Sequence, residues 1–321
     1  MLENTLTEAP LPEDSWDEIE LIPEGWSPSP DVHNHDGGPL FEDRVFFAPP
    51  PPEIGEVVTA SSTLPVGKKP MSTVNRFLLA GFAGSLVAVG LNLAGLETAL
   101  QVLAGLVVLP VVFWFTRFKH TLRYVGKNGV AILTAKSRPD RIDRTEVFLF
   151  SKASELRTGQ TRQYVNGVYS GTSYAFTWTD PAGKKAFKLS GTYRGEKNPP
   201  KPKDPFHFAE SAEMAWSFHL LDQAEQELKQ NGSIRFRLSG KDWVSVGPGF
   251  LEFARKGVEE RWEREEIGGI SIGDGVFKVK RTDAQEGWFS SKGVIQFTYA
   301  SMSNAKLFLI ALSRILGYTF N

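Results

Sequence analysis

Two groups of side chains in this 321-residue chain are of types that bind ions. His33-Asn34-His35-Asp36 offers imidazole, amide and carboxylate donors, which are ligands for divalent metals. The motif lies in a proline-rich segment with no scaffold to hold it and no obvious further ligands, so we expect no metal site there. The second group is basic: residues 117–205 hold 18 Lys/Arg against 7 Asp/Glu, a net charge of +11.

The basic residues point to anionic lipid head groups as a ligand. One cluster directly follows a long apolar block, and the other falls in an expected loop between two strands. A well-placed base near an anionic leaflet contributes up to about 1 kcal/mol of binding. The alternative is that the charge reflects membrane topology and ordinary solvation alone. The eight expected contact residues are Arg117, Lys119, Arg123, Lys127, Lys136, Arg138, Arg141 and Arg144.

Signatures of catalysis are missing from the sequence. The chain has no Cys, which excludes thiol nucleophiles and disulfides, and it contains neither a nucleophile elbow nor an HExxH motif. The glycines at Gly268-Gly269 and Gly273-Asp274-Gly275 belong to strands and turns and do not open a helix, so they do not form a phosphate loop. We therefore expect no catalytic residues, no cofactor, no metal and no enzymatic activity.

The apolar block that precedes the basic residues is long enough to cross a membrane twice. Between Arg76 and Arg117 lie 40 residues, of which only Glu97 is ionisable. One helix of that length would be about 60 Å long, twice the hydrocarbon thickness of a bilayer. A turn near Glu97 gives two spans of about 20 residues and leaves the carboxylate at an interface, where its cost is small. We expect a transmembrane helical hairpin over residues 75–118, packed through small residues such as Gly81 and Gly84; the alternative is a buried helical hairpin in a soluble protein.

The flanks of this block predict its orientation. Lys68, Lys69 and Arg76 precede it, and four bases from Arg117 to Lys127 follow it, whereas the turn carries none. The positive-inside rule then places both chain termini in the cytoplasm, in a multi-pass protein of the plasma or inner membrane. Trp114 and Phe118 would lie at the cytoplasmic interface.

The first 70 residues differ from the rest in composition. They hold 12 of the 20 prolines, and residues 1–60 carry 14 Asp/Glu and one Arg, a net charge of −13. Because so few apolar side chains cannot offset the entropy of ordering, we expect residues 1–70 to form a disordered acidic tail. Such a tail would compete with lipid for the basic region or bind a protein partner; its aromatic residues, such as Trp26, would either dock on a partner or stay solvated.

After residue 120 the pattern is that of short strands closed by helices. Asp180-Pro-Ala-Gly183 predicts a turn between strands, and Asn166-Gly167 predicts a second turn or a bulge. Apolar spacing predicts a helix over about 208–229, ended by Asn231-Gly232, and a second helix over about 303–316 capped by Gly317. The same order of elements occurs twice, which gives domains at 120–231 and 233–321.

These features resemble an uncharacterised family of bacterial membrane proteins with a transmembrane hairpin and tandem pleckstrin-homology-like (PH-like) domains. The likeness is carried by "QYVNGVYSGTSYAFTWTD" in the first half, and by "GKDWVSVGPGFLEF" and "ERWEREEIGGISIGDGVFKVK" in the second. It implies an α+β fold in which the hairpin precedes two antiparallel β-barrels, each plugged by a C-terminal helix. It implies no catalytic residues.

From these observations we expect a non-catalytic membrane protein that presents its cytoplasmic domains as a scaffold or sensor. Its expected partners are membrane lipids, a protein bound through the acidic tail or the barrels, and a second copy of the chain. Nucleic-acid binding is not expected, since membrane proximity explains the positive charge. The alternatives are a receptor for anionic lipid or peptide, and a membrane enzyme acting on lipids.

Overall fold

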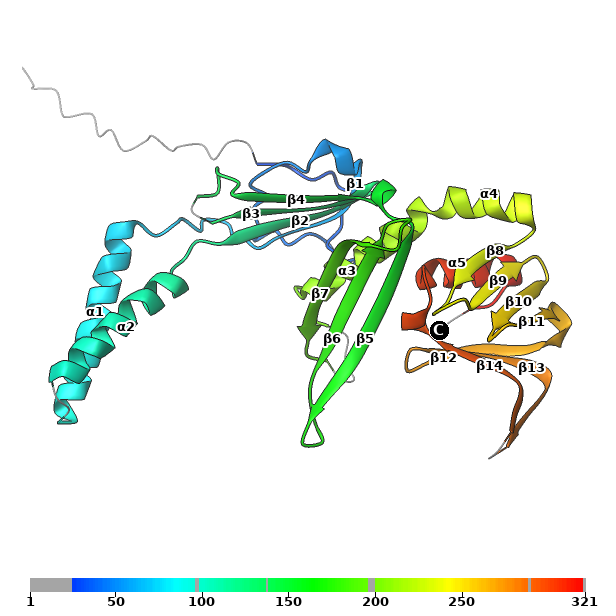
Figure 1. The fold of residues 1–321 in the computed structure, drawn as a ribbon. Coiled ribbons are helices and arrows are strands. Elements are labelled where there is room, and N and C mark those ends of the chain that lie inside the picture. Colours follow the sequence, from blue (N-terminus) through cyan, green and yellow to red (C-terminus); the bar gives the residue numbers. More distant parts are fainter. Residues whose placement is uncertain (1–24, 96–97, 137, 196–199, 288–289, 320–321) are drawn as a thin grey trace, which may run out of the picture.

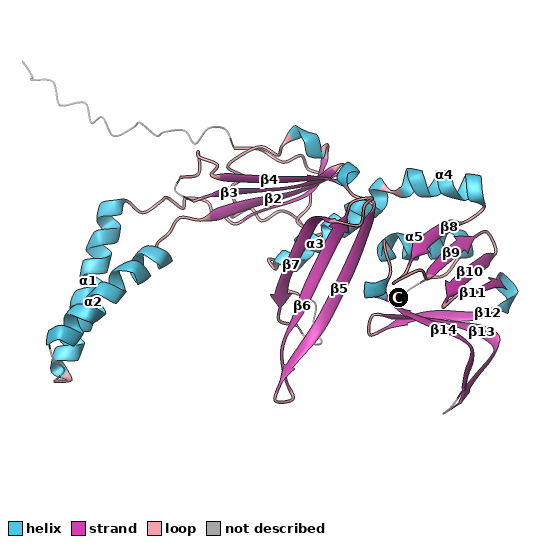
Figure 2. Cartoon of the chain, viewed as in Figure 1, coloured by secondary structure: helices cyan, strands magenta, loops and turns pink. Residues whose placement is uncertain are grey.

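The computed structural model describes residues 25–95, 98–136, 138–195, 200–287 and 290–319. The fold is α+β: antiparallel sheets make up two lobes, and a pair of helices projects from the first lobe (Figures 1 and 2). The predicted class is thus confirmed. The predicted disorder of residues 1–24 and the predicted turn at Glu97 lie outside the described residues.

The first lobe contains a four-stranded and a three-stranded antiparallel sheet. The first sheet has the order β1-β2-β3-β4, formed by Val57–Ser62, His120–Gly126, Gly129–Ala135 and Arg144–Leu149. A 3-10 turn, Phe150–Lys152, leads to the second sheet, β5-β6-β7, formed by Glu155–Val165, Val168–Thr179 and Lys185–Tyr193. The predicted turns after Val165 and Thr179 are both confirmed; Asn166 and Gly167 have φ of 52° and 79°, as a tight hairpin requires.

Two helices close the first lobe. Helix α3 is Pro205–His219 and α4 is Leu221–Asn231, with a break at Leu220 where a single helix is predicted. Asp204 caps α3 by accepting a hydrogen bond from the backbone N–H of Phe206. Gly232, with φ of 74°, ends α4 at the predicted place.

The first strand of this lobe precedes the helical pair in the chain. β1 pairs with β2 from Val57–Gly126 to Ser62–Leu122, although α1 and α2 lie between the two strands in sequence. The first lobe therefore starts before the helices and not at residue 120 as predicted, so that the helical pair is an insertion between two adjacent strands. Sequence patterns miss this arrangement because strand pairing across about 60 residues leaves no local signal.

The prediction of a disordered tail is wrong for residues 25–66. This segment covers one face of the β1–β4 sheet with Val32, Phe46, Phe47, Ile54 and Leu64, all buried. Trp26, rather than docking elsewhere, lies edge-on to Phe46 and to Tyr124 of β2, at centroid distances of 5.4 and 5.2 Å. These apolar residues are too few to build a core of their own, but they are enough to cover an existing sheet. The average composition of the segment does not distinguish these two cases.

The second lobe repeats the same order of elements. A four-stranded antiparallel sheet, β8 to β11, is formed by Ile234–Arg237, Trp243–Gly247, Phe250–Arg255 and Val258–Glu263. After the 3-10 turn Arg264–Glu266 comes a three-stranded sheet, β12 to β14, formed by Ile267–Gly273, Val276–Gly287 and Ser290–Thr298. Helix α5, Ala305–Leu316, follows and is capped by Gly317 with φ of 74°, as predicted. In this lobe a short turn joins the first two strands where the first lobe carries the helical pair.

One hydrophobic core runs through both lobes. Its buried side chains include Phe150, Trp178 and Trp216 of the first lobe and Phe277 and Phe308 of the second, and α3 contacts α5. The chain was predicted to form two tandem domains; in the structure the two lobes share one hydrophobic core.

The projecting helices are α1, Thr73–Leu93, and α2, Thr98–Phe115, which pack against each other and extend away from the lobes (Figure 1). Among the described residues, α1 is long and apolar enough to cross a membrane, while the apolar stretch Val102–Phe115 of α2 is shorter. By length and composition, one helix of the described residues is thus suited to cross a membrane, and the predicted second span is not shown.

Candidate functional site

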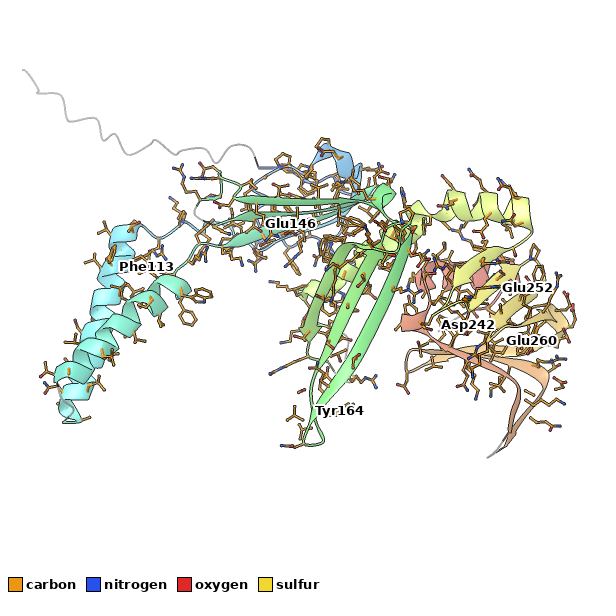
Figure 3. The ribbon with its side chains drawn as sticks, viewed as in Figure 1. Phe113, Glu146, Tyr164, Asp242, Glu252 and Glu260 are labelled. Atoms are coloured by element: carbon orange, nitrogen blue, oxygen red, sulfur yellow. The ribbon has the colours of Figure 1, made fainter. Side chains whose placement is uncertain are left out.

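The base of the helical pair is held by one basic side chain. Arg76, in the first turn of α1, donates from Nε to Thr116 Oγ1 at 3.0 Å and from Nη2 to the carbonyl of Phe113 at 2.5 Å. Its guanidinium also lies 4.4 Å from the centre of the Phe113 ring, and Phe77 packs edge-on to the same ring (Figure 3 labels Phe113). These contacts hold the start of α1 against the end of α2.

Most apolar side chains of α1, and most of those described in α2, are exposed. Only Ala80 of α1 is buried, and Leu78, Phe82 and Leu86 are each more than half exposed. Trp114 at the end of α2 is 73% exposed, whereas Phe118, predicted beside it at the membrane interface, is buried in the first lobe. An exposed apolar surface of this extent is typical of membrane or protein contact.

The glycines of α1 do not have the predicted packing role. A Cβ added at Gly81 or Gly84 would meet no atom within 4 Å, so neither position is a point of close helix approach. The two helices pack against each other, with the contact of Phe77 and Phe113 at their base.

Six of the eight predicted lipid-contacting bases gather at one end of the β1–β4 sheet. The register pairs His120 with Ala135 and Thr134 with Arg144, so the start of β2, the end of β3 and the start of β4 meet at the end of the sheet next to the helical pair. We call this set the basic end: Arg117, Lys119, Lys136, Arg138, Arg141 and Arg144. The two predicted clusters are thus brought together by strand pairing.

Acidic neighbours compensate part of the basic end. Asp140 pairs with Arg138 at 2.9 Å, and Glu146, labelled in Figure 3, pairs with Arg144. Asp143 accepts from the backbone N–H of Lys136. The other four bases of the set are all exposed, and none makes an ion pair within 4 Å with a described residue; they are Arg117, Lys119, Lys136 and Arg141.

The other two predicted bases lie elsewhere. Lys127 sits in the β2–β3 turn at the opposite end of the sheet, about 20 Å away along a seven-residue strand, and pairs with Glu56. Arg123 is on β2 but faces α3, with its guanidinium 5.9 Å from the ring of Phe208. Neither belongs with the basic end, because strand register and side-chain alternation decide where each points.

Arg123 faces a cavity of about 150 Å³. The cavity lies where the segment before β1, the end of β1 and the start of α3 meet, and two further bases line it, Arg44 and Lys203. Arg44 is 3.5 Å from Asp43, and the Lys203 amine lies 4.6 Å from the centre of the Phe41 ring. Burial lowers the pKa of Arg123, and this base has no ion-pair partner within 4 Å among the described residues.

Two members of the candidate metal motif also line this cavity. His35 Nδ1 lies 2.8 Å from Thr59 Oγ1, and burial, reinforced by the positive charge of Arg123, lowers the pKa of His35 to about 3. The ring is therefore neutral at physiological pH. Asn34 is 2% exposed, and its Nδ2 has no hydrogen-bond partner among the described residues. The motif that sequence placed in a solvated tail thus forms a wall of a basic cavity.

The junction between the lobes is built around Asn304. Its backbone N–H donates to the carbonyl of Leu156 on β5 at 2.8 Å, and its Oδ1 accepts from Leu156 N–H and from Trp216 Nε1, both at 2.9 Å. Asn304 has φ of 55°, a conformation that Asn tolerates better than most residues. One residue of the second lobe thus binds a strand and a helix of the first.

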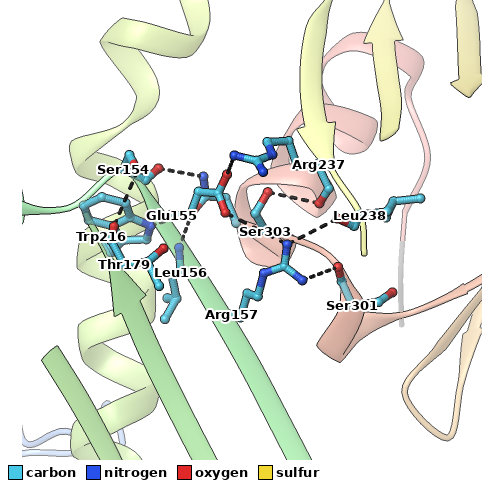
Figure 4. A network of polar contacts seen from close by, with 11 residues as sticks. Ser154, Glu155, Leu156, Arg157, Thr179, Trp216, Arg237, Leu238, Ser301 and Ser303 are labelled. Atoms are coloured by element: carbon cyan, nitrogen blue, oxygen red, sulfur yellow. Dashed lines mark hydrogen bonds and ion pairs between the residues drawn. The ribbon is translucent and has the colours of Figure 1, made fainter. Parts of the chain in front are cut away.

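Charged side chains extend the same junction (Figure 4). Arg157 of β5 donates to the carbonyls of Ser301 and Leu238, at 3.1 and 3.2 Å. Glu155 pairs with Arg237 of β8 at 2.9 Å. These bonds cross between lobes that share a core, so the two lobes are expected to move as one.

Glu213 is the buried carboxyl of the junction. It lies on α3 and accepts hydrogen bonds from the hydroxyls of Thr158 on β5, at 2.7 Å, and Tyr299 of the second lobe, at 3.2 Å. Burial raises the pKa of Glu213 to about 7, which the two hydroxyls and Lys306 only partly oppose. Sequence reasoning did not single out this residue, since its two partners lie 55 and 86 positions away.

No family model matches the chain, and no curated protein is significantly similar to it.

Proposed function

We propose that the chain is a non-catalytic membrane protein in which α1 and α2 cross the bilayer together and hold two PH-like lobes at the cytoplasmic surface as a scaffold or sensor. The observation that carries the proposal is the exposed apolar surface of the helical pair directly beside the basic end. In water this surface would be costly, since each fully buried aliphatic or aromatic side chain is worth about 1.5–3 kcal/mol. In a bilayer the same surface is solvated by lipid, and the bases meet the anionic leaflet.

The architecture supports the PH-like assignment of the lobes. Each lobe has a four-stranded sheet, a 3-10 turn, a three-stranded sheet and a closing helix, in that order. A helix that closes each lobe is what the resemblance implies. The insertion of the helical pair between β1 and β2 would tie the membrane directly to the first sheet, so a displacement of the helices acts on both neighbouring strands.

The absence of Cys provides a direct test of topology. Single cysteines are introduced at Ala94, in the exposed turn after α1, at Leu86 in the middle of α1, and at Val258 in the second lobe. With a membrane-impermeant maleimide on intact cells, Ala94→Cys is labelled, Leu86→Cys is not, and Val258→Cys is labelled only after permeabilisation. Labelling of Val258→Cys in intact cells, or recovery of the chain in the supernatant after ultracentrifugation, would disprove the proposal.

The basic end is expected to strengthen contact with anionic lipid. At up to about 1 kcal/mol each, its four bases without ion pairs would contribute up to about 4 kcal/mol, and salt would weaken this contribution. Because β1 belongs to the first lobe, the soluble fragment 117–321 lacks a strand, so competition by the acidic N-terminal residues is tested by comparing the full chain with a chain that starts at residue 25. Equal head-group binding by both, at low and at high salt, would eliminate a role for residues 1–24.

A further inference from the structure

We propose that the cavity beside Arg123 is a binding site for a phosphate group. Three bases, Arg44, Arg123 and Lys203, line it together with the hydroxyl-bearing residues Ser61 to Thr63. Guanidinium, ammonium and hydroxyl groups are the donors that bind phosphate oxygens in proteins. At about 150 Å³ the cavity has the volume of about five water molecules, which is room for a phosphate group with some of its hydration.

Arg123 is the residue that most requires a ligand. Its side chain is only partly exposed, and a charge withdrawn from water without a partner is costly, so Arg in such a position is normally paired. Burial lowers its pKa, which Tyr174 and then the Asp204 carboxylate only partly oppose, and Asp204 Oδ1 already accepts from the N–H of Phe206 at the start of α3. The guanidinium is not within ion-pair distance of Asp204 or of any other described carboxylate. An anion in the cavity would supply the missing countercharge.

Polar groups of the wall complete the site. Asn34 Nδ2 is a buried donor without a partner among the described residues, at a position that lines the cavity. His35 is neutral, so it adds no competing positive charge and can donate or accept. One carboxylate, Asp204, also lines the cavity, and against three bases it leaves a net charge of +2.

The position of the cavity suggests where the phosphate comes from. Arg123 lies three residues from the start of β2, about 10 Å from the point where the chain arrives from α2. Thr63 on the cavity wall bonds Thr121 N–H at 2.8 Å, directly at that junction. A lipid head group at the membrane surface could reach the site; this choice of source rests on the proposed function, whereas the phosphate site itself does not.

The test measures the thermal stability of the full chain, which binding raises by mass action. In neutral detergent, inorganic phosphate is compared with chloride at equal ionic strength; at a hundredfold excess over Kd, Tm is expected to rise by about 5 °C. In nanodiscs, phosphatidylcholine alone is compared with phosphatidylcholine containing phosphatidic acid. A shift in detergent only indicates a soluble phosphate, a shift in nanodiscs only indicates a head group, and either supports the site.

The variants separate binding from structural effects. Arg123→Met removes the charge but keeps the aliphatic stem, so it should melt higher than wild type in chloride and lose the phosphate shift. Lys203→Gln should weaken phosphate binding about 10- to 100-fold. Arg314→Met, on the exposed face of α5, is the matched control and should behave as wild type.

Retention of the full shift by both Arg123→Met and Lys203→Gln, or no shift from either phosphate source in wild type, would overturn the site. A lower melting temperature of Arg123→Met in chloride and in phosphate alike would assign Arg123 a purely structural role. If the chain does not integrate into nanodiscs the proposed function fails, and the detergent measurements still decide the phosphate site.

Discussion

Glu213 makes the stability of the lobe junction depend on pH. Its pKa is about 7 in the folded chain against an ordinary value of 4.5, so the folded state keeps its proton where the unfolded chain has lost it. The stabilisation of the folded state by protonated Glu213 is therefore complete below pH 4.5. It decreases as the pH rises from 4.5 to about 7, and it does not change further above that pH. The difference in pKa corresponds to about 3 kcal/mol.

Glu213→Gln tests this directly, because the amide imitates the protonated carboxyl and its oxygen still accepts from Thr158 and Tyr299. The variant should exceed wild type in unfolding free energy by less than about 1 kcal/mol at pH 5 and by about 3 kcal/mol at pH 8. Denaturant unfolding across this pH range, in one detergent and at constant ionic strength, gives both curves. The exposed Glu225 on α4 provides the matched control, Glu225→Gln.

Two charged side chains near Glu213 also affect its pKa. Lys306 lowers its pKa and Glu210 raises it, and both lie within the same junction. If wild type and Glu213→Gln show parallel stability curves from pH 5 to pH 8, the carboxyl is not titrating in this range and the reasoning fails. A difference that appears equally in Glu225→Gln would also refute it.

Three other perturbations test the fold. Asn304→Ala removes the side-chain hydrogen bonds across the junction and places Ala in a left-handed conformation, so it should cost about 2–4 kcal/mol in denaturant unfolding and expose the linker between lobes to protease; an unchanged midpoint would contradict the role given to Asn304. Gly126→Ala should cost about 1–3 kcal/mol, because a Cβ there would lie 2.3 Å from a carbonyl oxygen of the segment before β1, whereas Gly269→Ala has open space; similar melting temperatures for both would argue against that packing. Deleting residues 1–62 removes β1 and should abolish cooperative unfolding of the first lobe, while deleting residues 1–24 should leave it; a lobe that still unfolds cooperatively without residues 1–62 would show that β1 is dispensable.

Local patterns were enough to locate most elements of the fold. The turns at Asn166-Gly167 and Asp180 to Gly183 were predictable because hairpins require particular residues at their bends. The ends of α4 and α5 followed from Gly232 and Gly317, which adopt the left-handed conformation that stops a helix. Each of these signals acts over a few residues.

Long-range pairing explains what the sequence did not reveal. β1 lies in a proline-rich acidic segment, and only its partner β2, on the far side of the helical pair, makes it a strand. The predicted lipid-contacting bases show the same contrast between what local sequence reveals and what strand pairing decides. Two basic clusters were visible in the sequence. Strand register brings six of these bases together at one end of the β1–β4 sheet, places Lys127 at the other end of the sheet and directs Arg123 toward α3.

The sequence by itself determined which residues of this protein are apolar enough to leave water, where the chain turns and where its positive charge accumulates, because these are properties of neighbouring residues. The tertiary structure alone decided that the helical pair interrupts a sheet, that residues 25–66 cover that sheet, that Glu213 is buried and that Arg123 is partly buried. Burial changes the energy of a charge, and burial depends on which distant segments pack around it, which no local pattern contains.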